Sequence, residues 1–286
     1  MANRRYRINF FTIFVLMFII LFFSFGLVSN AVEIQSEEIT TIESRPKIKQ
    51  AFMLIKPQTP TASVILFAGG GGKIELGQTN GKPTIGEMQE DFLIKTMKNF
   101  AYHGFIVAVY DVPSDLKKKG MYTKTRMEEK HADDINAVAS YLKNQANIPV
   151  WLVGTSKGTI SAVNGAIRIK ENINGLILTS SVTKYRKTWK KYFKTHPNGI
   201  IDMDLDKITV PTLIVSHKDD KCEITPPGDA EKLKPALVNS PKVDVLYFTG
   251  GNKAKSKACG AGSTHRFYGI EEQVVKAIAE FIKSNF

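Results

Sequence analysis

The chain has 286 residues, 43% of them hydrophobic and 23% charged, and its 39 Lys and Arg residues against 27 Asp and Glu residues give a formal net charge of +12. This composition is that of a globular protein and excludes disordered, collagen-like and low-complexity classes. With only two cysteines, the chain can build neither a disulfide-dense scaffold nor a four-cysteine zinc site. The length is enough for a large buried core.

The N-terminus has the pattern of an export signal. Arg4, Arg5 and Arg7 precede an apolar run over 8–28, and small residues follow up to Ala31. A basic start, an apolar stretch and small residues before the cleavage point are typical of a secretory signal peptide, cut here after Ala31. The run is also long enough to span a bilayer as an uncleaved inner-membrane anchor. Either alternative predicts that the rest of the chain is periplasmic or secreted.

Beyond residue 61, short apolar runs alternate with helical patterns. Strands are predicted over 63–67, 105–110, 150–153, 176–178, 212–215 and 243–248. Runs that are apolar throughout are typical of a parallel sheet buried on both faces. Helices are predicted over 132–142 and 271–283, where apolar residues recur at helical spacing. The alternation predicts an α/β fold, a mostly parallel sheet with helices on both faces, which binds ligands at the carboxyl ends of its strands.

The same pattern divides the chain into three segments. Residues 1–31 are the signal peptide or anchor, and 32–60 are an extended lead-in punctuated by three prolines. Residues 61–286 form the α/β domain, with an insertion at about 182–207 between its fourth and fifth predicted strands.

Residues 154–158, Gly-Thr-Ser-Lys-Gly, directly follow the strand predicted over 150–153 and open a helix rich in small residues. The pattern G-x-S-x-G between a buried strand and a helix is typical of a nucleophile elbow, a strained turn that exposes a serine. A side chain at Gly154 or Gly158 would collide with neighbouring backbone. Ser156 is therefore the candidate nucleophile, and the alternative is a tight turn with an incidental serine.

A serine at such an elbow needs an acid and a base later in the chain, in the order Ser, Asp, His. The base belongs in the loop between the last strand and the last helix, and of the five histidines only His265 lies there. The acid belongs just after the preceding strand, where Asp219 and Asp220 compete, and loop length favours Asp220. His217, at the end of that strand, and His131, on a predicted helix, are interpreted as structural residues.

The chemistry of such a triad also requires an oxyanion hole. The base accepts the serine proton, the acid fixes the imidazole tautomer, and backbone N–H groups stabilise the oxyanion that forms. One expected donor is the amide of Lys157, the residue after the nucleophile. The other is expected from the glycine run 69–72, with Gly70 and Gly71 as the candidates.

Together these residues resemble the α/β-hydrolase superfamily from about residue 50 to the end of the chain. The resemblance rests on the glycine run 69–72, the elbow 154–158, Asp220 and His265. It implies a serine hydrolase that uses neither a cofactor nor a metal. Phe67 and Ala68 precede the glycines where many relatives have a His-Gly pair, so the donor in this loop stays open by one residue.

The two cysteines flank the predicted acid and base. Cys222 lies two residues after Asp220, and Cys259 lies six residues before His265. The loops that carry the acid and the base are neighbours in this fold, and an exported chain is oxidised. We therefore expect a disulfide that clamps the two loops together, with two free buried thiols as the alternative.

The predicted insertion carries a basic and aromatic stretch over 184–194. Tyr185, Trp189, Tyr192 and Phe193 recur there at helical spacing, with lysines around them. An insertion at this point is expected to form a short helical cap over the active site. In one interpretation the aromatic side chains pack on the body of the domain. In the other, the stretch is a basic interfacial helix that contacts a membrane surface or an acidic substrate.

The sequence favours an exported serine hydrolase that cleaves a small-molecule or lipid-like carboxylic ester through an acyl-enzyme. A peptidase, a thioesterase and an acyltransferase use the same triad and are alternatives. A non-catalytic binding protein of the cell envelope is the alternative of another class. A nucleic-acid partner is not expected, because the chain has no nucleic-acid motif and its positive charge is spread along the sequence.

Overall fold

The computed structural model describes residues 32–188 and 190–286, without the side chains of 191–193. The predicted export segment 1–31 and Trp189 lie outside the described residues. Among the helices that are described, none is both long and apolar enough to cross a bilayer.

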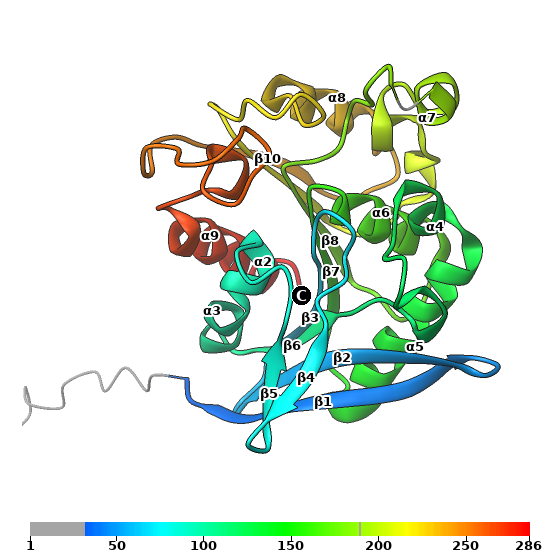
Figure 1. The fold of residues 1–286 in the computed structure, drawn as a ribbon, viewed down its shortest axis with the longest axis vertical. Helices are drawn as coiled ribbons and strands as arrows, with labels where there is room; N and C mark the ends of the chain where they lie inside the picture. Colours follow the sequence, from blue (N-terminus) through cyan, green and yellow to red (C-terminus); the bar gives the residue numbers. More distant parts are fainter. Residues whose placement is uncertain (1–31, 189) are drawn as a thin grey trace, which may run out of the picture. The chain divides into compact units, whose positions relative to one another are not determined.

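An eight-stranded sheet forms the centre of the domain (Figure 1). In spatial order its strands are β1 (Ile34–Arg45), β2 (Ile48–Pro57), β6 (Phe105–Tyr110), β3 (Ala62–Phe67), β7 (Val150–Thr155), β8 (Gly175–Thr179), β9 (Thr212–His217) and β10 (Val243–Phe248). β3 and β6 to β10 run parallel, whereas β2 is antiparallel to β6 and β1 is antiparallel to β2. Every strand predicted from the sequence is present, and the mostly parallel sheet is confirmed.

The first two strands replace the extended lead-in expected over 32–60. β1 and β2 form a hairpin that turns at Pro46–Lys47, and β2 joins the sheet through β6. The compact unit therefore begins at Val32 rather than near residue 61. β1 carries three glutamates, and charges on an edge strand discourage pairing with other chains while obscuring the strand pattern in the sequence.

A second, two-stranded sheet consists of β4 (Leu76–Thr79) and β5 (Lys82–Ile85), which the sequence analysis did not predict. The turn between them is Asn80-Gly81, and both residues have positive φ, +52° and +74°. Asn-Gly at a two-residue turn matches the twist of the flanking strands, which explains why the chain folds back here.

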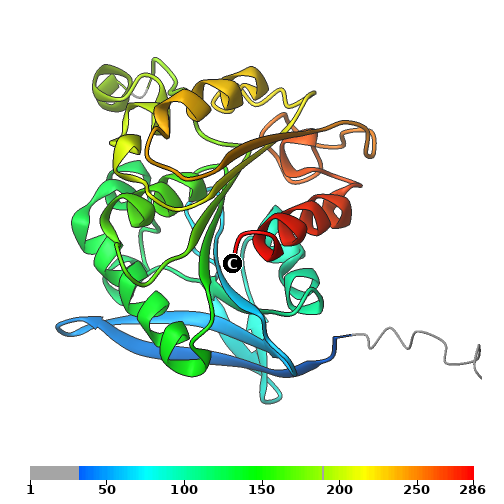
Figure 2. The ribbon, with the colours of Figure 1, turned by 180° about the vertical axis from the view of Figure 1, so that it is seen from behind.

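Helices cover both faces of the main sheet (Figures 1 and 2). The helices on one face are α2 (Phe92–Lys95), α3 (Met97–Tyr102) and α9 (Glu271–Lys283), and those on the other are α4 (Thr123–Met127), α5 (Glu129–Ala146) and α6 (Gly158–Arg168). α5 and α9 contain the two helices predicted from the sequence. Successive side chains of β3 alternate between the two cores: Val64 belongs to the core that includes α9, and Ile65 belongs to the core that includes α5 and α6.

The remaining helical elements are short. They are α7 (Lys190–Thr195), α8 (Ala230–Leu233) and 3₁₀ helices at Ser114–Leu116, Gly199–Asp202, Leu205–Lys207, Pro227–Asp229, Lys234–Ala236 and Thr264–Arg266.

The insertion differs from the single aromatic helix expected over 184–194. Among the described residues, the helix in this stretch is α7, Lys190–Thr195. Tyr185 precedes it and is buried in the core on the α5–α6 face. Tyr185 is therefore a residue of the domain core and not of α7. The expected contact of 184–194 with a membrane surface stays a prediction.

Candidate active site

The turn between β7 and α6 holds Ser156 in a left-handed conformation, with φ of +51°. Few residues other than glycine adopt this backbone, and at the end of a buried strand it is the geometry of a nucleophile elbow. The flanking glycines are required sterically. A Cβ at Gly154 would lie 2.6 Å from the carbonyl oxygen of Gly158, and a Cβ at Gly158 would lie 2.0 Å from that of Phe67. The collision expected from the sequence therefore exists at both positions.

The loops after β9 and β10 bring Asp220 and His265 into contact. Asp220 Oδ2 lies 2.9 Å from His265 Nδ1, and each side chain is only 1% exposed. Two further donors hold the carboxylate: the amide of Cys222 bonds Oδ1 at 2.8 Å, and Thr225 Oγ1 bonds Oδ2 at 2.9 Å. With its Nδ1 turned to the carboxylate, His265 has Nε2 left for proton transfer.

The competing carboxylate, Asp219, takes no part in this contact. Its side chain is 66% exposed, and its amide donates to Nδ1 of His217 at 3.0 Å. The buried His217 in turn bonds the carbonyl oxygen of Gly250 through Nε2 at 3.0 Å. His217 therefore joins the ends of β9 and β10, as expected of a structural residue, and the geometry favours Asp220 as the acid.

Cys222 and Cys259 form a disulfide, with their Cα atoms 4.8 Å apart. The bond ties the loop that carries Asp220 to the loop that leads to His265. The clamp expected from the sequence is therefore present.

The end of β8 links the elbow to the base. The amide of Ser156 donates to the carbonyl oxygen of Thr179 at 3.1 Å. The next residue, Ser180, donates its Oγ to the carbonyl oxygen of His265 at 2.8 Å. Two short links thus tie the candidate nucleophile and the candidate base to adjacent residues of one strand end.

Residues 68–72, which we call the glycine loop, lie beside the elbow. A Cβ at Gly69 would lie 3.1 Å from Ser156 Cβ. The amides of Gly69 and Gly72 are bonded within the domain, to Asp91 Oδ2 at 3.1 Å and to the Gly69 carbonyl oxygen at 3.0 Å. Among the described residues, the amides of Gly70 and Gly71 have no acceptor, which leaves them as the loop's candidate oxyanion donors.

Asp91, which the sequence analysis did not single out, connects the glycine loop to the base. Its buried carboxylate accepts the amides of Gly69 and Leu93, both at 3.1 Å, and binds Nη1 of Arg266 at 2.5 Å. Arg266 is the neighbour of His265. An aspartate just before the apolar residues of α2 was a helix-capping signal, but its contact with the loop depends on the fold.

Arg126 is the second missed residue. Its guanidinium is fully buried beneath the glycine loop, and burial lowers its pKa to about 10. Two neighbours respond to its charge. Burial lowers the pKa of the Lys157 ammonium, and Arg126 and Arg186 lower it further. Burial likewise lowers the pKa of His131 to about 3, again with a contribution from Arg126.

His131 is buried on α5, and its contacts do not include Asp220 or His265. Its Nε2 lies 2.9 Å from Ser161 Oγ of α6, and its ring packs edge-on against Tyr110. These contacts agree with the structural role expected for His131.

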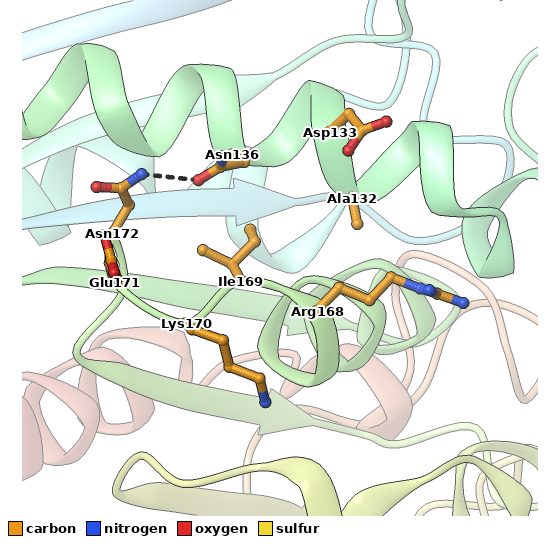
Figure 3. Close-up of a pocket in the computed structure, with 8 residues that line it drawn as sticks. All are labelled: Ala132, Asp133, Asn136, Arg168, Ile169, Lys170, Glu171 and Asn172. Atoms are coloured by element: carbon orange, nitrogen blue, oxygen red, sulfur yellow. Dashed lines mark hydrogen bonds between the residues drawn. The ribbon is translucent and has the colours of Figure 1, made fainter.

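A surface pocket of about 270 Å³ lies between α5 and the connection that follows α6 (Figure 3). Its lining includes two acidic and two basic side chains, and Asn172 Nδ2 donates to Asn136 Oδ1 at 2.8 Å. The pocket is at the C-terminal end of α6, whereas Ser156 is at the N-terminal end. It therefore does not belong to the candidate active site. Across the described residues, no group of three or more His, Cys, Asp or Glu side chains could hold a metal ion.

No protein-family profile and no curated protein matches this sequence, whereas solved structures share its fold. The esterase Pf2001 of Pyrococcus furiosus superposes with a TM-score of 0.62 at 14% identity, over 87% of this chain and 91% of that one. Est1E of Butyrivibrio proteoclasticus gives 0.57 at 16% identity, over 86% and 98%. XC6422 of Xanthomonas campestris, an α/β serine hydrolase without a lid, gives 0.56 at 14% identity, over 89% and 97%. At these identities the likeness establishes the architecture, and the chain has the α/β-hydrolase fold.

Proposed function

We propose that this chain is a serine hydrolase that cleaves a small-molecule or lipid-like carboxylic ester through an acyl-enzyme. One observation carries the proposal: the Asp220–His265 pair, bonded at 2.9 Å, shares the carboxyl edge of the sheet with a left-handed Ser156. The likeness to esterases and other hydrolases supports hydrolysis in general. The narrower assignment rests on the chemistry of these three side chains.

In the proposed reaction, Nε2 of His265 removes the proton of Ser156 Oγ while that oxygen attacks the ester carbonyl carbon. Asp220 keeps the other ring proton on Nδ1 and stabilises the imidazolium. The oxyanion accepts hydrogen bonds from the amide of Lys157 and from the glycine loop. His265 then returns the proton to the departing alcohol. A water molecule repeats these steps on the acyl-enzyme, releasing the acid and restoring the serine.

The test is covalent labelling of the purified protein with a fluorophosphonate probe, together with hydrolysis of a short-chain p-nitrophenyl ester. We expect the unmutated protein to be labelled and active and Ser156→Ala to be neither. Ser284→Ala is the control, because Ser284 lies at the far end of α9 and caps the Phe281 carbonyl. Absence of both labelling and turnover in the unmutated protein would refute the hydrolase proposal and favour a non-catalytic binding protein.

The same residues could act on a thioester or an amide or transfer the acyl group to another alcohol. Matched substrates with one acyl group separate these alternatives: a p-nitrophenyl ester, a thioester and a p-nitroanilide. We expect the ester to have the highest kcat/KM. A p-nitroanilide that exceeds the ester would move the assignment to a peptidase, and ester formation with an added alcohol would move it to an acyltransferase.

We further propose that the enzyme acts outside the cytoplasm. The Cys222–Cys259 disulfide supports this, because such bonds persist in oxidising compartments. Expression of the full chain, followed by fractionation and intact-mass measurement, tests it. A mature mass that begins after Ala31 would agree with a cleaved signal, and the full mass in a membrane fraction would agree with an anchor. Recovery of the full-length, reduced protein from the cytoplasm would contradict export.

A further inference from the structure

The fully buried Arg126 is an arginine whose hydrogen bonds go to neutral oxygens. Its Nε donates to the Met121 carbonyl at 3.2 Å, and its Nη1 donates to Ser161 Oγ at 2.6 Å. No described carboxylate forms an ion pair with it within the domain. A buried cation without a bonded anion is unfavourable for folding, so a residue of this kind is unexpected where it only fills space.

The remaining nitrogen of the Arg126 guanidinium, Nη2, faces the glycine loop. Nη2 donates to the carbonyl oxygen of Ala68 at 3.1 Å and has longer contacts with those of Gly69 at 3.4 Å and Gly70 at 3.5 Å. In a trans peptide unit the C=O and the N–H point in opposite directions. The carbonyl of Gly69 shares a peptide unit with the amide of Gly70, and the carbonyl of Gly70 shares one with the amide of Gly71. These amides therefore point away from the cation.

The first peptide of the loop is held from both ends. Its carbonyl, on Ala68, accepts from Arg126, and its amide, on Gly69, donates to Asp91 Oδ2 at 3.1 Å. A cation on the oxygen side and a carboxylate on the nitrogen side act along the same peptide dipole and fix its plane. Because Asp91 also binds the partly buried Arg266, its carboxylate links the loop to the residue next to His265.

The run of glycines fits the cation closely. Gly72 has φ of +64°, and a Cβ there would lie 2.5 Å from Arg126 Nη2. A side chain at position 72 would displace the guanidinium from beneath the loop. The position of Arg126 therefore requires glycine here, independently of any access that glycine gives to a substrate.

We propose that Arg126 is the positioning residue of the oxyanion hole. Its guanidinium holds the carbonyls of residues 68–70 inward, so that the amides of Gly70 and Gly71 point to the site of the oxyanion. The positive charge also polarises these peptides, which strengthens their N–H groups as donors just when negative charge develops. This inference rests on the proposed serine hydrolase and assigns a residue that does not itself touch the substrate.

The test compares Arg126→Met with Arg126→Lys and with Arg45→Met. Arg45 is a suitable control because its hydrogen bonds go to Asp134, with Nε 2.8 Å from Oδ1, and to Asp115. For each variant we would measure kcat and KM for a p-nitrophenyl ester, inhibition by a trifluoromethyl ketone that mimics the oxyanion, and the denaturant midpoint of unfolding.

For Arg126→Met we expect kcat to fall by about 10-fold to 100-fold with KM changed by less than about threefold, and trifluoromethyl ketone affinity to fall in parallel with kcat. Arg126→Lys keeps the charge but cannot span both the loop and Ser161, so it should lose less kcat in the same pattern. Arg45→Met should alter the unfolding midpoint without altering ketone affinity.

The outcomes separate this inference from the function on which it rests. An active unmutated protein together with a folded Arg126→Met variant of unchanged kcat and ketone affinity would overturn the positioning role alone. If Arg126→Met does not fold, unchanged kcat and ketone affinity in Arg126→Lys would overturn it equally. An unmutated protein with no labelling and no turnover would remove the serine hydrolase proposal, and this role with it.

Discussion

Replacing both disulfide cysteines by serine, Cys222→Ser with Cys259→Ser, should chiefly destabilise the folded protein. The bond closes a loop with a sequence separation of 37 residues. For a loop of that length, the entropy that the cross-link removes from the unfolded chain corresponds to about 4 kcal/mol at 25 °C. For a domain of this size, about 2–4 °C of melting temperature is lost per kcal/mol, so we expect Tm to fall by about 8–16 °C.

The effect on turnover should be smaller, because the direct contacts of the acid do not pass through the sulfur atoms. The amide of Cys222 and the hydroxyl of Thr225 hold the Asp220 carboxylate at 2.8 and 2.9 Å, and a serine at 222 keeps the same amide. At temperatures where the variant is folded, kcat should therefore stay close to that of the unmutated protein. Tm and kcat therefore distinguish a disulfide that stabilises the fold by restricting the unfolded chain from one that positions active-site residues.

Urea unfolding, followed by circular dichroism with and without reductant, measures how much the disulfide contributes to the free energy of unfolding. The unmutated protein should lose about 4 kcal/mol on reduction, whereas the double variant should not respond to reductant. A loss below about 1 kcal/mol would refute the loop-entropy argument, because it lies outside the usual range for a native disulfide. A collapse of kcat in a fully folded variant would instead mean that the sulfur bridge positions the acid.

Two further predictions concern single side chains. Asp220→Asn should lower kcat by about 10³- to 10⁴-fold, because an asparagine favours the wrong imidazole tautomer, while Asp219→Asn should leave kcat nearly unchanged, and steady-state ester hydrolysis distinguishes the two. His131 should make the folded state acid-sensitive. The pKa of His131 is about 3 in the folded state, whereas its ordinary value is near 6.5. Between these two pH values the unfolded chain binds a proton at this histidine and the folded chain does not. The free energy of unfolding should therefore fall as pH drops from about 6.5 towards 3, by a total on the order of 5 kcal/mol from this residue. His131→Gln should flatten urea-unfolding stability over this range and His196→Gln, outside the core, should not; equal slopes in both variants would contradict the assignment.

Most of the strands predicted from the sequence are buried along their whole length, whereas β10 is half-buried and still has a mostly apolar sequence. Strands such as Phe105–Tyr110 are buried on both faces, so they appear in the sequence as continuous apolar runs. β1 lies at the sheet edge and mixes glutamates with isoleucines and threonines, so its pattern resembles a linker. β4 and β5 are four residues each, and only the Asn80-Gly81 turn between them carried a signal.

The stretch around α7 illustrates a different limit. Helical spacing of the aromatic residues predicted one face, but spacing has meaning only where the helix exists. Tyr185 lies before α7 and is committed to the core. Sequence alone cannot distinguish a true helical face from a periodic pattern that spans the boundary between core and insertion. The difference lies in which residues are buried, and the rest of the fold determines that.

The candidate site shows the same division between chain order and spatial contact. Ser156, Asp220 and His265 could be chosen because each follows a recognisable strand, and the order of the strands fixes which loops meet. Asp91 and Arg126 follow no such rule, since Asp91 carried only a helix-capping signal and Arg126 was indistinguishable from a surface charge. Arg126 counts towards the net charge of +12 like any exposed lysine, yet it is fully buried against the carbonyls of the glycine loop. The sum of charges describes what a protein presents to its surroundings only when all charges face outward. Here Arg126, like Asp91 and Asp220, is buried, and the chemistry we propose for it follows from where it is buried.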